Sequence, residues 1–166
     1  LAEIQGGKVL DIPCGVGRHS VELHKKGFDV VGVDKTTSYV EEAREKTERD
    51  IEFVNEDMKK FRRDDEFDAA FNLWNSFGYF ETREEDRQMM ENIFRSLKNG
   101  GKLVIEMWSK ELTALKNMHK LWHEQDSSYF LTDPEVTENF RKVEWDWIKI
   151  EDGEVKKYEW SQRLYA

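Results

Sequence analysis

A glycine-containing loop follows the first apolar segment of the chain. Asp11 lies near the end of the run Lys8–Ile12, and Gly15 and Gly17 come soon after that run, ahead of a helical pattern. Glycine lets backbone N–H groups approach a ligand closely, and the N-terminus of a helix is electropositive. The loop at residues 13–18 therefore suits a carboxylate or a phosphate group, although a Gly-x-Gly spacing alone is a weak signal.

A second acid, Asp34, closes the next apolar segment, Phe28–Val33. An acid at the end of the second strand can accept hydrogen bonds from both hydroxyl groups of a ribose. The loop and this acid together predict a nucleoside cofactor. The alternative interpretation is a tight turn followed by an aspartate that caps a helix.

The residues around the loop favour S-adenosylmethionine (SAM) over a nicotinamide dinucleotide. A dinucleotide-binding loop carries a third glycine, and this chain has Ser20 at that position. Asp11 would repel a pyrophosphate, whereas it can bind the ammonium group of a methionine moiety. A nicotinamide-dependent oxidoreductase stays open as an alternative.

Polar and aromatic side chains follow the fourth apolar segment, residues 67–73. This segment should face the reactive end of the cofactor, where amide and hydroxyl groups can orient a nucleophile and aromatic faces can favour a sulfonium cation. A turn with core aromatic residues is the alternative. The predicted cofactor contacts here are Asn72, Leu73 and Trp74, and the predicted substrate contacts are Asn75, Ser76 and Tyr79.

Three histidines are candidates for a site. His19 lies in the first helical turn after the loop, where it either touches the cofactor or lies on the helix surface. His119 and His123 are four residues apart, so one helix face could carry both as metal ligands. Because no third ligand has a clear spacing, we expect no metal site. His123, beside Trp122, is also a candidate substrate contact.

The elements that position these residues can be read from short apolar runs that alternate with amphipathic segments. Strands are expected at residues 8–12, 28–33, 51–54, 67–73 and 102–107, with helices between them. This alternation predicts an α/β fold in which a parallel sheet has helices on both faces. Ligands of such sheets bind at the carboxyl ends of the strands, near the switch in strand order.

Two helices have residue patterns that predict their boundaries and buried faces. The helix over about 38–49 carries Tyr39, Val40 and Ala43 on one face. The next helix opens at Thr82, which has capping-box spacing to Glu85, and Asn99-Gly100-Gly101 is expected to stop it. Its residues at core spacing are Met89, Met90, Ile93, Phe94 and Leu97.

The pattern changes after about residue 108. Residues 140–150 and 154–165 are expected to be two long strands joined by a turn at 151–153, and Trp145, Trp147, Tyr158 and Trp160 lie in them. We therefore expect a SAM-binding core over 1–108 and an antiparallel extension over 109–166 that forms one compact unit with it. The extension would contribute to the substrate pocket or to an interface, and a homodimer through its aromatic residues is an open alternative.

Composition bears on partners and location. The net charge of −9 disfavours nucleic acid as a partner, and the basic cluster at residues 59–63 is followed at once by three acids. The chain has no apolar run near 18 residues and no signal-peptide pattern at Leu1–Lys8, so we expect no membrane association. The single cysteine, Cys14, is expected to be structural and suits the cytoplasm.

Several segments resemble the class I SAM-dependent methyltransferases. The run VLDIPCGVGRHSVEL and the later GFDVVGVD resemble the glycine-loop motif and the acidic strand end, especially in members with a D-x-P-C-G-x-G-R loop. The run IEFVNEDM resembles the third-strand motif, in which residues matching Asp57 and Met58 flank the adenine. Pro13 departs from the common glycine. The usual sixth and seventh strands are not recognisable, so we expect a truncated or partial domain.

The resemblance implies a Rossmann-like, doubly wound sheet with strand order 3-2-1-4-5 and transfer of a methyl group from SAM, leaving S-adenosylhomocysteine. We expect direct in-line displacement by a small-molecule N or O nucleophile, with no assigned catalytic base. The alternatives are an RNA or protein methyltransferase, the oxidoreductase, and a non-catalytic SAM-binding module. The expected cofactor contacts are Asp11, Pro13, Cys14, Gly15, Gly17, Arg18, Asp34, Lys35, Asp57, Met58, Asn72, Leu73 and Trp74.

Overall fold

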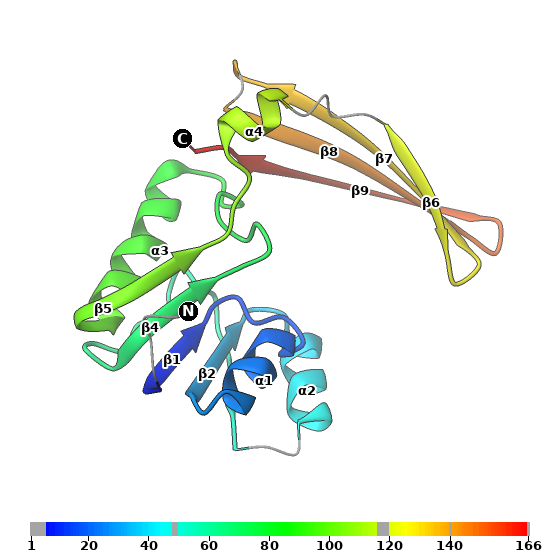
Figure 1. Ribbon diagram of the computed structural model, residues 1–166. Helices are drawn as coiled ribbons and strands as arrows, with labels where there is room; N and C mark the ends of the chain where they lie inside the picture. The colour runs from blue at the N-terminus through cyan, green and yellow to red at the C-terminus, as the bar shows by residue number, and fades with distance from the viewer. Residues whose placement is uncertain (1–5, 48–49, 116–119, 140, 166) are drawn as a thin grey trace. The chain divides into compact units, whose positions relative to one another are not determined.

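The computed structural model describes residues 6–47, 50–115, 120–139 and 141–165. The chain divides into two compact units (Figure 1). The first unit comprises Leu1–Ser76 and Glu81–Met107, and the second comprises Phe77–Phe80 and Trp108–Ala166. A short segment of the first half of the chain therefore belongs to the second unit.

The first unit contains a five-stranded parallel sheet in the order β3-β2-β1-β4-β5. This order confirms the expected doubly wound topology. The order reverses at β1, which pairs with β2 on one side and with β4 on the other. The strands are β1 (Lys8–Asp11), β2 (Asp29–Asp34), β3 (Glu52–Asn55), β4 (Phe67–Asn72) and β5 (Leu97–Ile105).

Three helices accompany this sheet: α1 (Arg18–Lys25), α2 (Thr37–Lys46) and α3 (Arg83–Ser96). In Figure 1, α1 and α2 lie beside the β1–β2–β3 half of the sheet, and α3 lies beside β4 and β5. The predicted capping box opens α3, because the Thr82 hydroxyl accepts the Glu85 N–H and the Glu85 carboxylate accepts the Thr82 N–H. None of the helices in the described part of the chain is long and apolar enough to cross a membrane.

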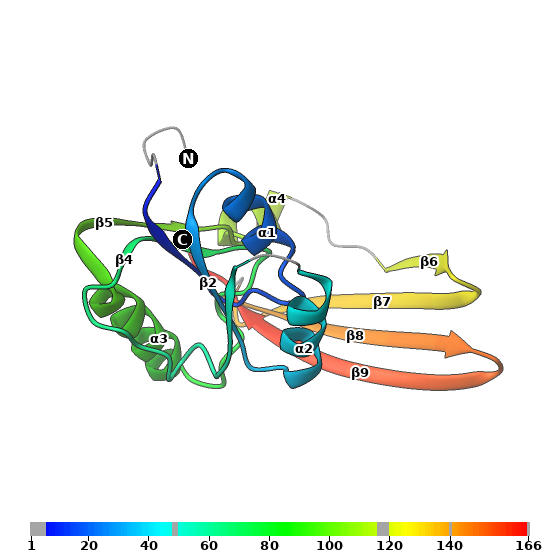
Figure 2. The same ribbon diagram turned by 90° about the horizontal axis from the view of Figure 1, so that it is seen from below.

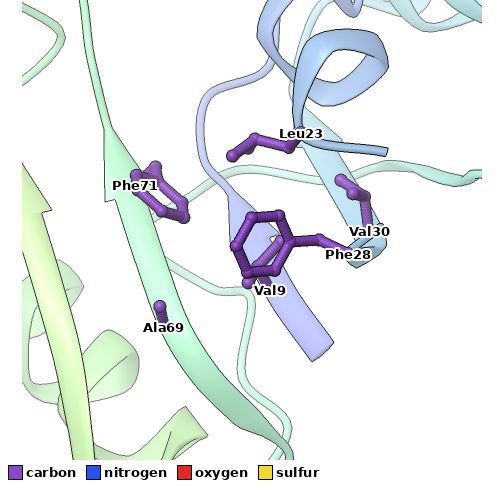
Figure 3. Close-up of a cluster of buried hydrophobic side chains, with 6 residues drawn as sticks. All are labelled: Val9, Leu23, Phe28, Val30, Ala69 and Phe71. Atoms are coloured by element: carbon purple, nitrogen blue, oxygen red, sulfur yellow. The ribbon is translucent and has the colours of Figure 1, made fainter. Parts of the chain in front are cut away.

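The buried core of the sheet is built from apolar residues of adjacent strands and of α1. One cluster joins β1, β2 and β4 to Leu23 of α1 and to Phe28, which precedes β2 (Figure 3). Parallel strands with both faces covered read as continuous apolar runs, which is why these strands were predictable. The cluster consists of Val9, Leu23, Phe28, Val30, Ala69 and Phe71.

The expectation that Phe94 belongs to the core is wrong. Its side chain is 76% exposed, whereas Met89 and Ile93 on the same helix are buried. The buried stripe of α3 also contains the polar residues Asp86 and Ser96, and Phe94 lies about 100° around the helix from Ile93. The apolar spacing therefore predicted the wrong buried face for α3, because the face that is actually buried is narrower and includes polar residues.

The end of α3 also differs from the expectation. The helix ends at Ser96, and β5 begins at Leu97 instead of after a glycine stop. Pairing with β4 runs from Phe67 opposite Leu97 to Ala69 opposite Lys102, with a register shift between them. The Asn99–Gly101 segment therefore lies in a bulge inside the strand, a place where glycine is common.

The second unit contains a four-stranded antiparallel sheet in the order β6-β7-β8-β9, seen from below in Figure 2. The predicted hairpin is confirmed, because β8 and β9 pair from Lys142–Arg163 to Glu151–Glu154 around the turn at 152–153. The elements are α4 (Lys110–Leu115), β6 (Leu121–Gln125), β7 (Ser128–Thr137), β8 (Lys142–Glu151) and β9 (Glu154–Arg163).

Strands β6 and β7 were not predicted. Their turn is Asp126-Ser127, with both residues at positive φ, and it lacks the glycine that usually marks such a hairpin. Strand β7 also contains Pro134, which has no N–H to donate to a ladder. In the structure Pro134 lies beyond the stretch of β7 that pairs with β6, so no hydrogen bond to β6 is lost.

A pair of substitutions on α3 tests the assignment of its buried face. Ile93→Ala should lower the free energy of unfolding by about 2–5 kcal/mol, because it leaves a cavity in the core. Phe94→Ala should change it by less than about 0.5 kcal/mol, because that ring is exposed. Urea denaturation followed by circular dichroism measures both values, and an equal loss in the two variants would contradict the assignment.

Candidate functional site

A pocket of about 380 Å³ opens at the carboxyl ends of β1, β2 and β4. It lies at the switch in strand order, where ligands of doubly wound sheets bind. Its walls come from the loop after β1, the end of β2, the start of α2 and the segment after β4. The lining residues are Pro13, Cys14, Gly15, Val16, Arg18, His19, Asp34, Tyr39, Leu73, Trp74 and Ser76.

The glycine loop is held against the end of β2. Gly15 has a φ of 55°, and its N–H donates to the Asp34 carboxylate at 2.9 Å. Apart from Gly15 itself and its two chain neighbours, no described residue has a heavy atom within 4 Å of the position that a Gly15 Cβ would take. The backbone at Gly15 is thus open toward the pocket, as a loop that cradles a ligand requires.

Gly17 has a different reason to be glycine. It precedes α1 with a φ of 79°, and a Cβ there would stand 2.9 Å from the Phe53 ring and 3.2 Å from the Ala43 side chain. The ring of Phe53, which is buried, fills the space beneath the loop. Gly17 therefore serves the close packing of the loop on β3 and α2 and does not line the pocket.

The Asp34 carboxylate lies at the pocket wall with 6% of the residue exposed. One oxygen accepts the Gly15 N–H at 2.9 Å, and the other accepts the Thr36 N–H at 2.8 Å. Each carboxylate oxygen has a second lone pair, so the group can still accept two hydrogen bonds from a ligand. Vicinal hydroxyl groups, as in a ribose, fit this arrangement.

Asp11 lies behind the loop and does not line the pocket. It is fully buried, and one carboxylate oxygen accepts the Ser20 hydroxyl at 2.6 Å. Burial raises the pKa of Asp11 to about 7, and the Ser20 hydrogen bond opposes that rise. The carboxyl group is therefore half protonated near neutral pH. Burial also raises the pKa of the Cys14 thiol, so Cys14 is not a thiolate nucleophile.

The segment after β4 provides the opposite wall. The buried Asn72 amide donates to the Ile12 carbonyl at 2.7 Å and so ties β4 to the end of β1. Trp74 is 64% exposed. Its indole N–H donates to His19 Nε2 at 3.2 Å, and the Arg18 guanidinium lies 5.3 Å from the ring centroid. Trp74 is thus a pocket residue and not a core aromatic.

The structure brings together seven of the thirteen predicted cofactor residues in this pocket: Pro13, Cys14, Gly15, Arg18, Asp34, Leu73 and Trp74. Lys35, Asp57 and Met58 are outside its lining, and Asp57 accepts the Lys59 N–H at 2.9 Å. Val16 and Tyr39 line the pocket without having been predicted. Tyr39 was expected on the same face of α2 as Val40 and Ala43, because it lies four residues before Ala43. In the structure Ala43 is buried, whereas Tyr39 is exposed.

The predicted substrate residues are divided between the two units. Ser76 lines the pocket, whereas Tyr79 belongs to the antiparallel unit. There its ring lies 5.3 Å from Trp160, which stacks on Trp145 at 5.2 Å. Trp108 meets Trp145 edge-on at 6.3 Å. We call these four rings the aromatic ladder.

The hypothesis that His119 and His123 share one face of a helix is wrong for His123. His123 lies on strand β6 and stacks on Phe130 with ring centroids 5.1 Å apart, and His119 lies outside the described residues. Local spacing misled because a helical face requires a helix, and His123 lies in a strand. Within the described ranges, no group of three or more His, Cys, Asp or Glu side chains is placed to hold a metal.

The buried Asp11 carboxyl should make stability depend on pH. Its pKa is about 7 in the folded chain and 3.8 ordinarily, so the folded state binds more protons between these values and stability falls as pH rises. Asp11→Asn, which cannot ionise, should remove on the order of 3 kcal/mol of that fall between pH 5 and pH 7.5. Urea denaturation at both pH values measures the difference, with Asp29→Asn as the exposed control. Equal slopes in wild type and Asp11→Asn would show that Asp11 does not titrate in this range.

Known proteins resemble this chain in sequence. YqeM of Bacillus subtilis (strain 168) is 32% identical over 106 residues, which cover 62% of this chain and 43% of that protein. A glycine/sarcosine N-methyltransferase of Aphanothece halophytica is 31% identical over 117 residues, which cover 68% of this chain and 44% of that enzyme. The chain thus spans less than half the length of these relatives.

A solved structure and a protein family also resemble this chain. An S-adenosylmethionine-dependent methyltransferase from Clostridium acetobutylicum ATCC 824 has the same fold, with a TM-score of 0.80 at 16% identity, covering 98% of this chain and 68% of that one. Residues 9–101 match the methyltransferase domain family. Because that match covers more than half of the chain, the chain belongs to this family, the class I SAM-dependent methyltransferases, and SAM is its cofactor.

Proposed function

We propose that the protein transfers a methyl group from SAM to a small-molecule N or O nucleophile by direct in-line displacement. The observation that carries the proposal is the pocket at the strand switch, in which the open backbone of Gly15 and the carboxylate of Asp34 lie side by side. Family membership supports the methyl-transfer chemistry.

In this proposal Asp34 accepts the two ribose hydroxyls, and the first turn of α1 receives the carboxylate of the methionine moiety. Arg18 begins α1 and lies over the Trp74 ring. It makes no ion pair with any residue in the described part of the chain, so its charge is available to an anionic group. The positive end of the helix favours the same carboxylate.

Bound SAM supplies a methyl group that its sulfonium already activates for displacement. The protein's contribution is then mainly alignment, and well-oriented reactants gain roughly 7–11 kcal/mol of barrier reduction. Leu73, Trp74 and Ser76 follow β4 at the pocket, where they would orient the acceptor. This division of work needs neither a nucleophilic side chain nor a metal.

Two observations support a small acceptor over a nucleic acid. The chain carries a net charge of −9. The basic cluster at residues 59–63 is also largely neutralised, because Lys59 pairs with Glu85, Arg62 with Asp64 and Arg63 with Glu52. Phosphate binding needs basic side chains free to replace counterions, and this cluster offers few.

The acceptor we favour is an amine. The Aphanothece relative is named for methylation of glycine and sarcosine, which are small amines. The aromatic ladder of the antiparallel unit supplies indole and phenol faces, and such faces attract alkylammonium groups. We propose that these rings can bind an alkylammonium group.

Substitution of Asp34 tests the cofactor site. Asp34→Ala should weaken binding of S-adenosylhomocysteine at least about tenfold, because it removes hydrogen bonds to a charged acceptor. Asp29→Ala, at the exposed start of the same strand, should leave the affinity unchanged. Isothermal titration calorimetry measures both, with circular dichroism to confirm folding. An unchanged affinity in folded Asp34→Ala would refute the ribose contact.

An acceptor screen tests the reaction. The protein is incubated with SAM and, in parallel, with small primary and secondary amines, small alcohols, a lysine-containing peptide and a mixed-sequence RNA. We expect S-adenosylhomocysteine to accumulate with one or more small amines. Turnover with RNA or peptide alone would favour a macromolecular acceptor, and SAM binding without any turnover would favour a binding module. Binding of NAD but not SAM would overturn the proposal.

A further inference from the structure

Two consecutive residues of the segment after β4 have a left-handed backbone. Trp74 has a φ of 58° and Asn75 a φ of 55°. Residues with a Cβ adopt this conformation rarely, and large side chains most rarely. Such a conformation persists only where surrounding contacts hold it, and it is concentrated at functional sites. The contacts that hold Trp74 therefore identify residues on which the pocket depends.

Glu106, which follows β5, supplies those contacts. Its backbone N–H donates to the Asn72 carbonyl at 2.9 Å, and its carbonyl accepts the Asn75 N–H at 3.1 Å. Its carboxylate accepts the Trp74 N–H at 3.2 Å. The first two bonds use the backbone of Glu106 and could form with any residue other than proline at this position. Only the bond to Trp74 requires the side chain of Glu106.

The left-handed turn decides where the Trp74 indole lies. The indole N–H reaches His19 Nε2, and the ring face lies against the Arg18 guanidinium. Both partners belong to the first turns of α1, and all three side chains line the pocket. Trp74 thus joins the segment after β4 to the helix after the glycine loop.

We propose that Glu106 is a positioning residue for the cofactor pocket. It does not line the pocket, and it acts through Trp74, whose indole in turn holds the Arg18 side chain in place. Loss of the Glu106 carboxylate leaves the backbone N–H of Trp74 without this acceptor. The left-handed turn then relaxes, and the indole moves away from His19 and Arg18. The consequence for ligand affinity rests on the proposed function, because that function names the pocket's occupant.

Two substitutions of Glu106 separate a side-chain role from a backbone one. Glu106→Ala removes the acceptor, whereas Glu106→Gln keeps an amide oxygen that can accept the same N–H. Glu106→Ala should weaken binding of S-adenosylhomocysteine about three- to tenfold, as expected for one lost hydrogen bond. Glu106→Gln should bind within about twofold of wild type. Glu91→Ala, an exposed glutamate on α3, is the control.

The indole N–H of Trp74 provides a readout that does not depend on the ligand. In ¹⁵N-labelled protein its cross-peak is identified among the six tryptophans by its loss in Trp74→Phe. Glu106→Ala should move this peak toward the position of a solvent-exposed indole, and Glu106→Gln and Glu91→Ala should not. An unmoved peak in folded Glu106→Ala would overturn the proposal.

The two readouts also separate this proposal from the proposed function. If wild-type protein does not bind S-adenosylhomocysteine, the proposed function fails, and the Trp74 peak still decides whether Glu106 positions the indole. If wild type binds and Glu106→Ala binds equally well, the positioning role fails while the cofactor assignment stands. A shifted peak together with weaker binding supports both.

Discussion

The hydrogen bond from the Gly15 N–H to the Asp34 carboxylate is the contact on which the site depends. It joins the loop after β1 to the end of β2, so the open backbone and the acid face one pocket. The Thr36 N–H occupies the other oxygen and fixes the direction of the carboxylate. Charge-assisted bonds of this kind are stronger than neutral ones, which suits a loop that must keep its shape before a ligand arrives.

Packing beneath the loop is as demanding as its hydrogen bonds. The ring of Phe53 occupies the space that a side chain at Gly17 or at Gly32 would need, because a Cβ at either position would stand less than 3.0 Å from it. One buried aromatic residue therefore accounts for two glycines on different elements. The same ring sets how closely α2 and β3 approach the loop, because protein interiors have little free volume.

Buried polar side chains at this edge of the sheet hold the walls of the pocket in place. Asn72 ties β4 to the end of β1, and Asp11 holds Ser20 of α1. Both are buried, so both act on the pocket by holding its walls. Glu106 and Trp74 extend this arrangement to the segment after β4. Walls on different strands are thus fixed by a few side-chain contacts, as a preorganised site requires.

Local sequence patterns were sufficient to predict many of the strands, helices and turns of this protein. Each of these features depends on residues that lie within a few positions of one another, so the sequence alone predicts it. Examples are the apolar runs, the Thr82–Glu85 capping box and the loop around Gly15. Right-handed crossovers leave few topologies for such a sheet, and the resemblance to the class I methyltransferases implied the strand order. The β8–β9 hairpin follows from its Asp-Gly turn.

Tertiary structure alone decided which side chains are exposed and which distant residues meet. Phe94 is exposed and Asp11 is buried because of what packs against them, and neither outcome is encoded by spacing along the chain. The Trp74 indole donates to His19, 55 residues away in sequence, and the Trp74 backbone N–H donates to Glu106, 32 residues away. Such contacts follow from the lateral order of strands, since the sheet brings the ends of β1, β4 and β5 together only after it has formed.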